Sequence, residues 1–347
     1  MKKRLTVFLV AILLIVAAGC SNNEASSNNT NSSNTSEGGK ENSGETIKIA
    51  LGSVTSETSP FHVFLTKFKE EVDKNSNGQI EVSLHPNGEL GGDREMIEAV
   101  QIGSLDGVIS SSAVLGNFTS LVNVLDFPFL FRDQDHAYKV LDGEIGDEIA
   151  AAIEGSGLKL IAWPENGFRN ITNSQRPIKS LEDIKDLKIR TQENKVIVDS
   201  FTEYGASPTP MSFTEVFSAL QQGVVDGQEN PLSIVVSSKL YEVQKYLTIS
   251  NHLYGAAPFT MNKELFDGLS PELQKVIQDA AYLARDHQRQ YIADMDAEFL
   301  KEIEAQGMEI VQSEDFDRKG FEEASEEIYK KYEKEYGDII QRIKDTE

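Results

Sequence analysis

Polar and charged residues that could contact a ligand gather between residues 166 and 230, at the ends of expected strands. Arg169 lies within the expected strand Phe168–Thr172, and Arg190 ends the expected strand Leu187–Arg190. Asn230 ends a polar segment that follows another short strand. Ligands of open α/β sheets bind beyond the carboxyl ends of strands, so the pattern predicts a ligand site there. The alternative is ordinary polarity of surface loops.

Motifs that carry catalysis are absent from the sequence. It has no Walker phosphate loop, no dinucleotide-binding glycine fingerprint and no nucleophile elbow. Asp133 and Asp135 lack the glycine and distal glutamate of a calcium loop, so we expect them to cap a helix. The histidines are too widely spaced for a short metal-binding motif: they are His62, His85, His136, His252 and His287. We expect no cofactor, no metal and no enzymatic activity.

Length and charge narrow the classes of protein further. The chain has 347 residues, with 33 Lys and Arg against 56 Asp and Glu, giving a formal net charge of −23. A length above about 250–300 residues favours more than one compact unit. The acidic excess argues against binding to nucleic acid, which would repel it. Hydrophobic residues make up 39% of the chain, which is enough for a buried core.

The single cysteine, Cys20, follows an amino-terminal segment that is typical of exported proteins. Lys2, Lys3 and Arg4 precede an apolar run that extends to Ala18 and is too short to span a bilayer. Small residues end this run directly before Cys20, which resembles the lipobox of bacterial lipoproteins. The resemblance implies a signal peptide over residues 1–19 and a lipid on Cys20. A plain secretory signal is the alternative.

Residues 20–45 are expected to form a tether between this lipid and a folded body. Between residues 21 and 36, 12 of the 16 residues are Ser or Asn. Such a segment cannot bury enough apolar surface to offset its ordering entropy. We therefore expect the body to be held on the outer face of the cytoplasmic membrane.

Strand and helix patterns alternate from residue 46 onward, which predicts an α/β fold with mostly parallel sheets. Phe61, Phe64, Phe68 and Val72 recur at helical spacing within residues 60–77. Another helix is expected over residues 93–102, and an acidic helix with a solvated face over 322–335. Strands are expected over residues 47–51, 79–84, 107–110, 158–163, 168–172, 187–190 and 258–261.

One expected helix is unusually long. Ser270 is a suitable cap, Pro271 suits the first helical turn, and the helical pattern continues to Gln306. Its 36 residues would extend about 54 Å at 1.5 Å per residue, more than the width of one small domain. A helix laid across two lobes fits this length, either continuous or broken midway.

Several motifs together resemble the solute-binding subunit of tripartite ATP-independent periplasmic (TRAP) transporters, of the DctP type. Their order and spacing match from residue 46 to the carboxyl terminus. The motifs cover residues 88–94 (GELGGDR), 166–169 (NGFR), 187–190 (LKIR), 205–210 (GASPTP), 225–231 (VDGQENP) and 241–246 (YEVQKY).

The resemblance implies a two-lobed α/β fold, like that of periplasmic binding proteins, with a long helix spanning both lobes. Lobe I would comprise residues 46–167 and 256–295, and lobe II residues 168–255 and 296–347. The lobes would close on a small carboxylate ligand and deliver it to the membrane subunits of the transporter. We expect a monomer.

Individual residues take expected roles from the same resemblance. Arg190 matches the arginine that anchors the ligand carboxylate, and Arg169 a second arginine of many sugar-acid binders. Phe213 matches an aromatic residue that packs on the ligand. Asn230 matches a residue that hydrogen-bonds the carboxylate or a hydroxyl, and Asp93 one that can reach a hydroxyl or water.

Two positions depart from the pattern of sialic-acid binders. Ser111 lies where those proteins carry a glutamate, and Glu193 replaces an asparagine. We therefore favour a sugar acid such as a hexuronate, with a C4-dicarboxylate or sialic acid as alternatives. A cell-surface enzyme, a binding protein of an ATP-driven importer or a ligand sensor are rival classes.

Overall fold

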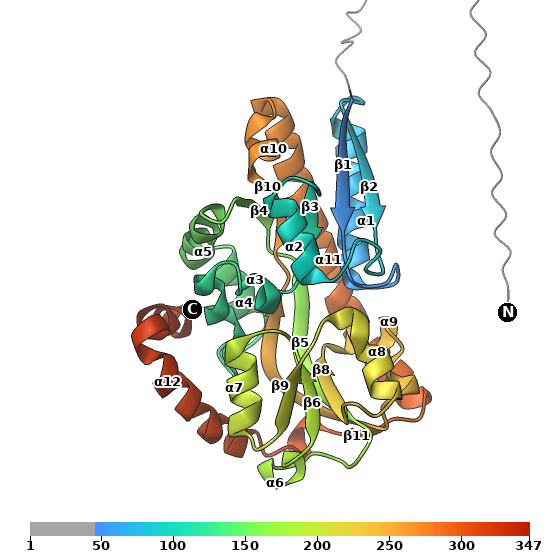
Figure 1. The fold of residues 1–347 in the computed structure, drawn as a ribbon, viewed down its shortest axis with the longest axis vertical. Helices are drawn as coiled ribbons and strands as arrows, with labels where there is room; N and C mark the ends of the chain where they lie inside the picture. Colours follow the sequence, from blue (N-terminus) through green and yellow to red (C-terminus); the bar gives the residue numbers. More distant parts are fainter. Residues whose placement is uncertain (1–45) are drawn as a thin grey trace, which may run out of the picture. The chain divides into compact units, whose positions relative to one another are not determined.

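The computed structural model describes residues 46–347, which contain two β-sheets and the helices that pack on them (Figure 1). The signal peptide predicted over residues 1–19, the lipidation predicted at Cys20 and the tether predicted over residues 20–45 lie outside the described residues. No helix of residues 46–347 is both long and apolar enough to cross a membrane.

The first sheet has five strands and includes the amino-terminal strand of the body. β1 pairs in parallel with β2 and β3, whereas β10 is antiparallel to β3 and β4. On one face, Phe64 and Phe68 of α1 contact the ring of Phe259 edge-on, at centroid distances of 5.1 and 5.0 Å. The strand order is β2 (Ile80–His85), β1 (Ile47–Gly52), β3 (Gly107–Ile109), β10 (Phe259–Asn262) and β4 (Leu158–Ala162).

The second sheet has six strands and supplies most of the candidate site residues. β5 and β9 run antiparallel to each other (Figure 1), and their pairing has two irregularities in register. β7 contains Pro208 and Pro210 and lies at an edge, where the missing N–H groups leave no ladder bond unmade. The strand order is β11 (Glu309–Val311), β9 (Tyr246–Ala256), β5 (Glu165–Asn173), β8 (Gly227–Asn230), β6 (Lys188–Thr191) and β7 (Ser207–Pro210).

Helices and short 3₁₀ segments cover these sheets. They are α1 (Pro60–Asn75), α2 (Asp93–Gln101), α3 (Ser112–Leu115), η1 (Ser120–Asp126), α4 (Gln134–Leu141), α5 (Glu144–Glu154), α6 (Leu181–Ile184), α7 (Lys195–Glu203), α8 (Phe213–Gln221), α9 (Leu232–Ser237), η2 (Leu240–Glu242), α10 (Lys263–Gly268), α11 (Pro271–Ala305), η3 (Ser313–Asp315) and α12 (Arg318–Asp345).

The expected long helix is confirmed as α11, which is one unbroken helix of 35 residues. Ser270 caps it by accepting a hydrogen bond from the backbone N–H of Leu273. Its first half places Ile277 and Ala284 in the core around the first sheet. Its last turns place Phe299 and Ile303 in a separate core beside the second sheet. The helix therefore joins the two parts of the fold.

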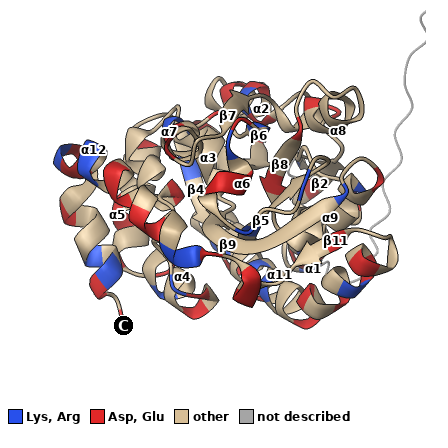
Figure 2. Ribbon diagram, turned by 90° about the horizontal axis from the view of Figure 1, so that it is seen from below, with Lys and Arg blue, Asp and Glu red and all other residues tan. Residues whose placement is uncertain are grey.

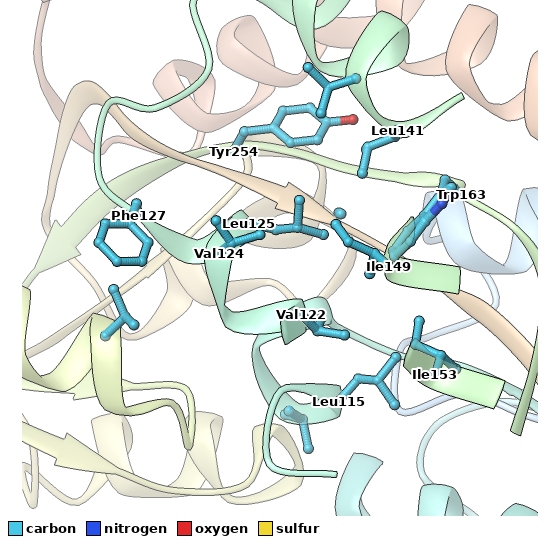
Figure 3. Packing of buried hydrophobic residues seen from close by; sticks show 14 of the residues in the cluster. Leu115, Val122, Val124, Leu125, Phe127, Leu141, Ile149, Ile153, Trp163 and Tyr254 are labelled. Atoms are coloured by element: carbon cyan, nitrogen blue, oxygen red, sulfur yellow. The ribbon is translucent and has the colours of Figure 1, made fainter. Parts of the chain in front are cut away.

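Another core lies between the sheets and connects them. Figure 3 shows side chains of η1, α4 and α5 packed near Trp163 and Tyr254. Trp163 directly follows β4, and Tyr254 lies on β9. α12 adds Ile328, Tyr332 and Tyr336 to the same core. Acidic and basic residues both occur along the rest of α12 (Figure 2). The acidic segment 322–335 is thus helical as expected, but its opposite face is buried.

Differences from the sequence expectations concern strands. The segment around Pro208 was expected as a turn and instead forms β7, and the long strand β9 was not expected at all. Each sheet combines parallel and antiparallel pairs. The proposed division into lobes, 46–167 with 256–295 and 168–255 with 296–347, stays a prediction. α12 packs against both α5 and α7, so it contacts both predicted lobes.

Candidate functional site

Arg169 lies at the centre of a buried polar network on the second sheet. Antiparallel pairing of β5 with β8 places Ile171 opposite Glu229 and Asn170 opposite Asn230. The Arg169 Nε donates to the Glu229 carboxylate, and Nη2 donates to Glu229 Oε1 at 2.9 Å and to Asn230 Oδ1 at 3.0 Å. Arg169 is 0% exposed, and its Nη1 has no partner within the described chain.

Glu229 compensates the charge of Arg169. Burial acts to raise the pKa of Glu229, but attraction to the Arg169 guanidinium, the hydrogen bonds from Arg169 and the nearby His252 outweigh it and lower the pKa to about 2. The His252 Nε2 lies 3.6 Å from Glu229 Oε2, and its Nδ1 lies 2.8 Å from the Ser250 hydroxyl. Arg169 and Glu229 therefore form a neutral pair at neutral pH.

Arg190 lies on the neighbouring strand β6 and has no carboxylate of its own. Its Nε and Nη2 donate to the backbone carbonyl of Met211 at 3.1 and 2.7 Å. Within residues 46–347 its guanidinium forms no salt bridge within 4.0 Å. Its Cζ lies 5.9 Å from the centre of the Phe213 ring. Burial and the nearby Arg169 lower its pKa to about 10, so Arg190 stays positively charged at neutral pH.

Asp93 faces this cation from the first residue of α2. Its side chain is 7% exposed, and Oδ1 has no hydrogen-bond partner within residues 46–347. Burial raises its pKa to about 7, and attraction to Arg190 opposes that rise. A Cβ placed on Gly92 would lie 2.5 Å from the Ser212 hydroxyl, so α2 closely approaches the segment that precedes α8.

Ser111 and Glu193 contact the same region but bond to other protein groups. Ser111 accepts a hydrogen bond from Gln192 Nε2 at 2.7 Å and caps α3. The Glu193 carboxylate lies 3.8 Å from Arg94 Nε, and its carbonyl accepts from Asn117. These contacts link α2 and the segment that follows β3 to the segment that follows β6. The structure thus gives both residues protein partners near the site.

The structure brings most of the predicted residues together in one place. We call the set Asp93, Arg169, Arg190, Phe213, Glu229 and Asn230 the arginine cluster. Sequence reasoning missed Glu229, which lies inside a quoted motif, and His252, which lies on the unexpected strand β9. An acidic residue in a short strand near a strand-borne arginine was the available signal for Glu229.

Residues 46–347 contain no group of three or more His, Cys, Asp or Glu that could hold a metal ion. Asp133 accepts a hydrogen bond from the backbone N–H of His136 at 2.8 Å and caps α4, as expected.

Comparisons with known proteins agree with this geometry. Residues 51–335 match the family described as bacterial extracellular solute-binding protein, family 7 (DctP). A solute-binding protein of Verminephrobacter eiseniae is 42% identical over 82% of this chain and 84% of its own length. The 2,3-diketo-L-gulonate-binding periplasmic protein of Escherichia coli is 38% identical over 80% of this chain and 84% of its own.

A solved structure is similarly close. The TRAP periplasmic solute-binding protein of a Polaromonas species, bound to D-erythronate, superposes with a TM-score of 0.85. It is 40% identical, and the match covers 87% of this chain and 99% of that one. These matches identify a binding protein rather than an enzyme. The chain belongs to family 7 of the bacterial extracellular solute-binding proteins, the DctP-type solute-binding proteins of TRAP transporters.

Proposed function

We propose that this protein captures a sugar acid with one carboxylate and several hydroxyl groups, and delivers it to the membrane subunits of a TRAP transporter. Relatives that bind 2,3-diketo-L-gulonate and D-erythronate support a sugar-acid ligand. A hexuronate belongs to the same chemical class. The ligand would lie against the arginine cluster, with Arg190 as its anchor.

The charge balance of the arginine cluster is the observation that carries the proposal. Arg169 is neutralised by Glu229, so Arg190 is the cation of the cluster that lacks a carboxylate partner. A desolvated charge is stable only when it is paired. One ligand carboxylate would complete that pairing, and a second would remain without a cation.

Polar atoms without partners suit the hydroxyl groups of such a ligand. Asp93 Oδ1 and Arg169 Nη1 are both buried and lack hydrogen bonds within the described chain. A carboxyl oxygen and a guanidinium N–H can accept from and donate to hydroxyls. A C4-dicarboxylate would instead bring its second charge towards Asp93, which disfavours this alternative. Sialic acid is disfavoured because Ser111 and Glu193 depart from the pattern of its binders.

Ligand binding tests the role of Arg190 directly. A thermal-shift screen of uronates, aldonates, C4-dicarboxylates and sialic acid would identify ligands. A ligand at about 100 times its Kd adds about 2.7 kcal/mol of stability. Arg190→Ala should abolish the shift while the unliganded protein keeps its fold by circular dichroism. Near wild-type affinity in this variant would refute the assignment of the anchor.

We also propose that the protein is a monomer anchored to the outer face of the cytoplasmic membrane through a lipid on Cys20. The basic residues, apolar run and small residues that precede Cys20 support the lipid anchor. Mass spectrometry of the protein from membranes should find a diacylated amino-terminal cysteine. An unmodified amino terminus beyond Cys20 would contradict the proposal.

The predicted lobes would close around the ligand. Contacts between segments of the two predicted lobes, such as Gln192 with Ser111 and Arg94 with Glu193, support closure on the arginine cluster. A ligand that contacts both lobes stabilises the closed state because it binds that state better. Small-angle X-ray scattering should show a smaller radius of gyration when the sugar acid is added.

A further inference from the structure

A separate cavity of about 380 Å³ lies at the start of β5, and we call it the β5 cavity. It shares no lining residue with the arginine cluster. Its polar walls come from β5, from the start of α9 and from the middle of α11. Aliphatic side chains of Leu232, Ile292 and Leu300 also line it. The cavity thus has a polar part and an apolar part, as small-molecule sites commonly do.

Three residues that line the β5 cavity carry buried oxygen atoms without hydrogen-bond partners in the described chain. These atoms are Glu165 Oε1, Asn166 Oδ1 and Ser233 Oγ. The three residues are 0%, 6% and 3% exposed. An unsatisfied buried polar group costs about 1–3 kcal/mol. A ligand that supplies N–H or O–H donors would therefore stabilise this part of the fold.

The protein holds Glu165 firmly in this position. Its backbone N–H donates to Gln288 Oε1 at 3.1 Å, and its carbonyl accepts from Gln288 Nε2. Tyr138 donates its hydroxyl proton to Glu165 Oε2. Gly167 has a φ of +111°, and a Cβ there would lie 3.9 Å from Glu165 Oε1 and 3.5 Å from Cβ of Pro231. The free carboxyl oxygen and the residue that precedes α9 therefore both lie close to Gly167.

The charge of the Glu165 carboxylate is not paired within the protein. Glu165 forms no salt bridge among residues 46–347, and a second acid, Asp296, lies at the exposed rim of the same cavity. Two arginines also line the cavity, but both are engaged elsewhere. Arg132 donates to backbone carbonyls near the carboxyl terminus, and Arg318 donates to Glu322. Arg132 keeps its charge, because backbone carbonyls do not neutralise it, but Asp133, Glu165 and Asp296 outnumber it among the lining residues. The charged lining of the cavity therefore favours a cation.

We propose that the β5 cavity binds an organic ammonium ion, such as a protonated primary amine with a short aliphatic chain. An ammonium group has one positive charge and three N–H donors, which match one carboxylate and three unpartnered oxygens. The aliphatic chain would contact Leu232, Ile292 and Leu300. A metal ion fits less well, because it would need more charged oxygen ligands than this end of the cavity provides.

The ionisation of Glu165 sets the conditions for a test. Burial raises the pKa of Glu165 to about 7, opposed by the hydrogen bond from Tyr138 and attraction to Arg289, while Asp296 raises it further. Titrations at pH 8 therefore start from the carboxylate. We would titrate the intact protein with n-butylamine and with 1,4-diaminobutane by isothermal calorimetry. Tetramethylammonium is the matched control because it carries the charge without N–H donors.

Both primary amines should bind saturably, and tetramethylammonium should bind at least about tenfold more weakly, since it loses the charge-assisted hydrogen bonds. Glu165→Gln, which keeps the size of the side chain, should also weaken amine binding by at least about tenfold. Ser233→Ala should weaken it by a few fold. Asp294→Asn changes an exposed acid on α11 outside the cavity and should leave binding unchanged.

Four results would overturn the proposal: no saturable amine binding, equal affinity for tetramethylammonium, unchanged affinity in Glu165→Gln, or calcium binding in place of the amines. Amine binding that is lost in Arg190→Ala but kept in Glu165→Gln would also overturn it. Thermal unfolding of each variant checks that it remains folded. The proposal is independent of the sugar-acid function, because the two tests use different ligands and different variants.

Discussion

Glu229 and Glu165 are both fully buried, yet the protein treats their charges in opposite ways. Glu229 faces the guanidinium of Arg169 and lies close to His252, so its carboxylate is stabilised inside the arginine cluster. The Glu165 carboxyl group has one hydrogen bond, from Tyr138, and no salt bridge within the described chain. Glu229 thus pairs with a cation of the protein itself, whereas the Glu165 carboxylate is available to pair with a bound cation.

The largest difference should appear in stability when each acid is made neutral. Glu229→Gln leaves the buried Arg169 without its counter-charge and should cost about 3–5 kcal/mol of unfolding free energy. Glu165→Gln removes an unpaired buried charge and should leave stability unchanged at low pH and raise it near pH 7. Urea unfolding of both variants measures this. Equal losses of unfolding free energy in the two variants would contradict this difference between the acids. Glu215→Gln, which neutralises an exposed acid, is the control and should leave stability unchanged.

Arg190 offers the next largest effect, on binding rather than folding. Truncating one partner of a buried hydrogen-bonded charge pair costs about 2–5 kcal/mol of binding free energy. Arg190→Ala should therefore lose most of its affinity for a sugar acid. Arg190→Lys keeps the charge but loses the two-bond geometry. Its affinity for the sugar acid should therefore lie between those of wild type and Arg190→Ala. If calorimetry finds that Arg190→Lys binds the sugar acid as tightly as wild type, binding does not depend on a fixed two-bond contact with the carboxylate.

The two acids should also give stability opposite dependences on pH. The folded-state pKa of Glu229 is lowered to about 2, so its contribution is present above its unfolded value near 4.5 and is lost as pH falls towards 2. The folded-state pKa of Glu165 is raised to about 7, so its ionisation destabilises the fold as pH rises from about 4.5 to 7.

Variants isolate these two dependences. The stability difference between wild type and Glu229→Gln should shrink below pH 4.5. The difference between wild type and Glu165→Gln should move in favour of the variant as pH rises to 7. Urea unfolding across this pH range measures both. The same direction of change for both acids would contradict the account.

The smallest effect is expected at Ser111. Its hydroxyl accepts from Gln192, so Ser111→Ala removes one hydrogen bond between the segments that follow β3 and β6. A neutral hydrogen bond contributes about 0.5–1.5 kcal/mol, which corresponds to a loss of affinity of about tenfold or less. Binding should keep its preference among ligands. A changed preference would show that Ser111 contacts the ligand directly.

Local patterns predicted much of the fold. The apolar spacing of Phe61, Phe64 and Phe68 predicted α1, and the cap at Ser270 predicted the start of α11. β9 was missed because its polar residues, such as Asn251 and His252, hide the alternation of a strand. The strand β7 was missed because its prolines indicate a turn unless the strand lies at a sheet edge.

The candidate site was predictable in part. The family resemblance selected Arg190 and Arg169, but the motifs did not indicate that Arg169 has a carboxylate partner within the protein whereas Arg190 has none. That difference depends on Glu229, which lies 60 residues after Arg169 and reaches it only through the pairing of β5 with β8. The β5 cavity was not predicted, because Glu165 and Ser233 meet through tertiary packing rather than through a local motif.

The most direct test of the central claim compares aldonates with the aldarates of the same carbon skeleton. D-erythronate with its matching tartrate, and D-gluconate with D-glucarate, differ by one carboxylate in place of a terminal alcohol. Because Arg190 is the unpaired cation of the arginine cluster, calorimetry should show that the monocarboxylate of each pair binds at least about tenfold more tightly. Equal or tighter binding of the dicarboxylates would contradict the account.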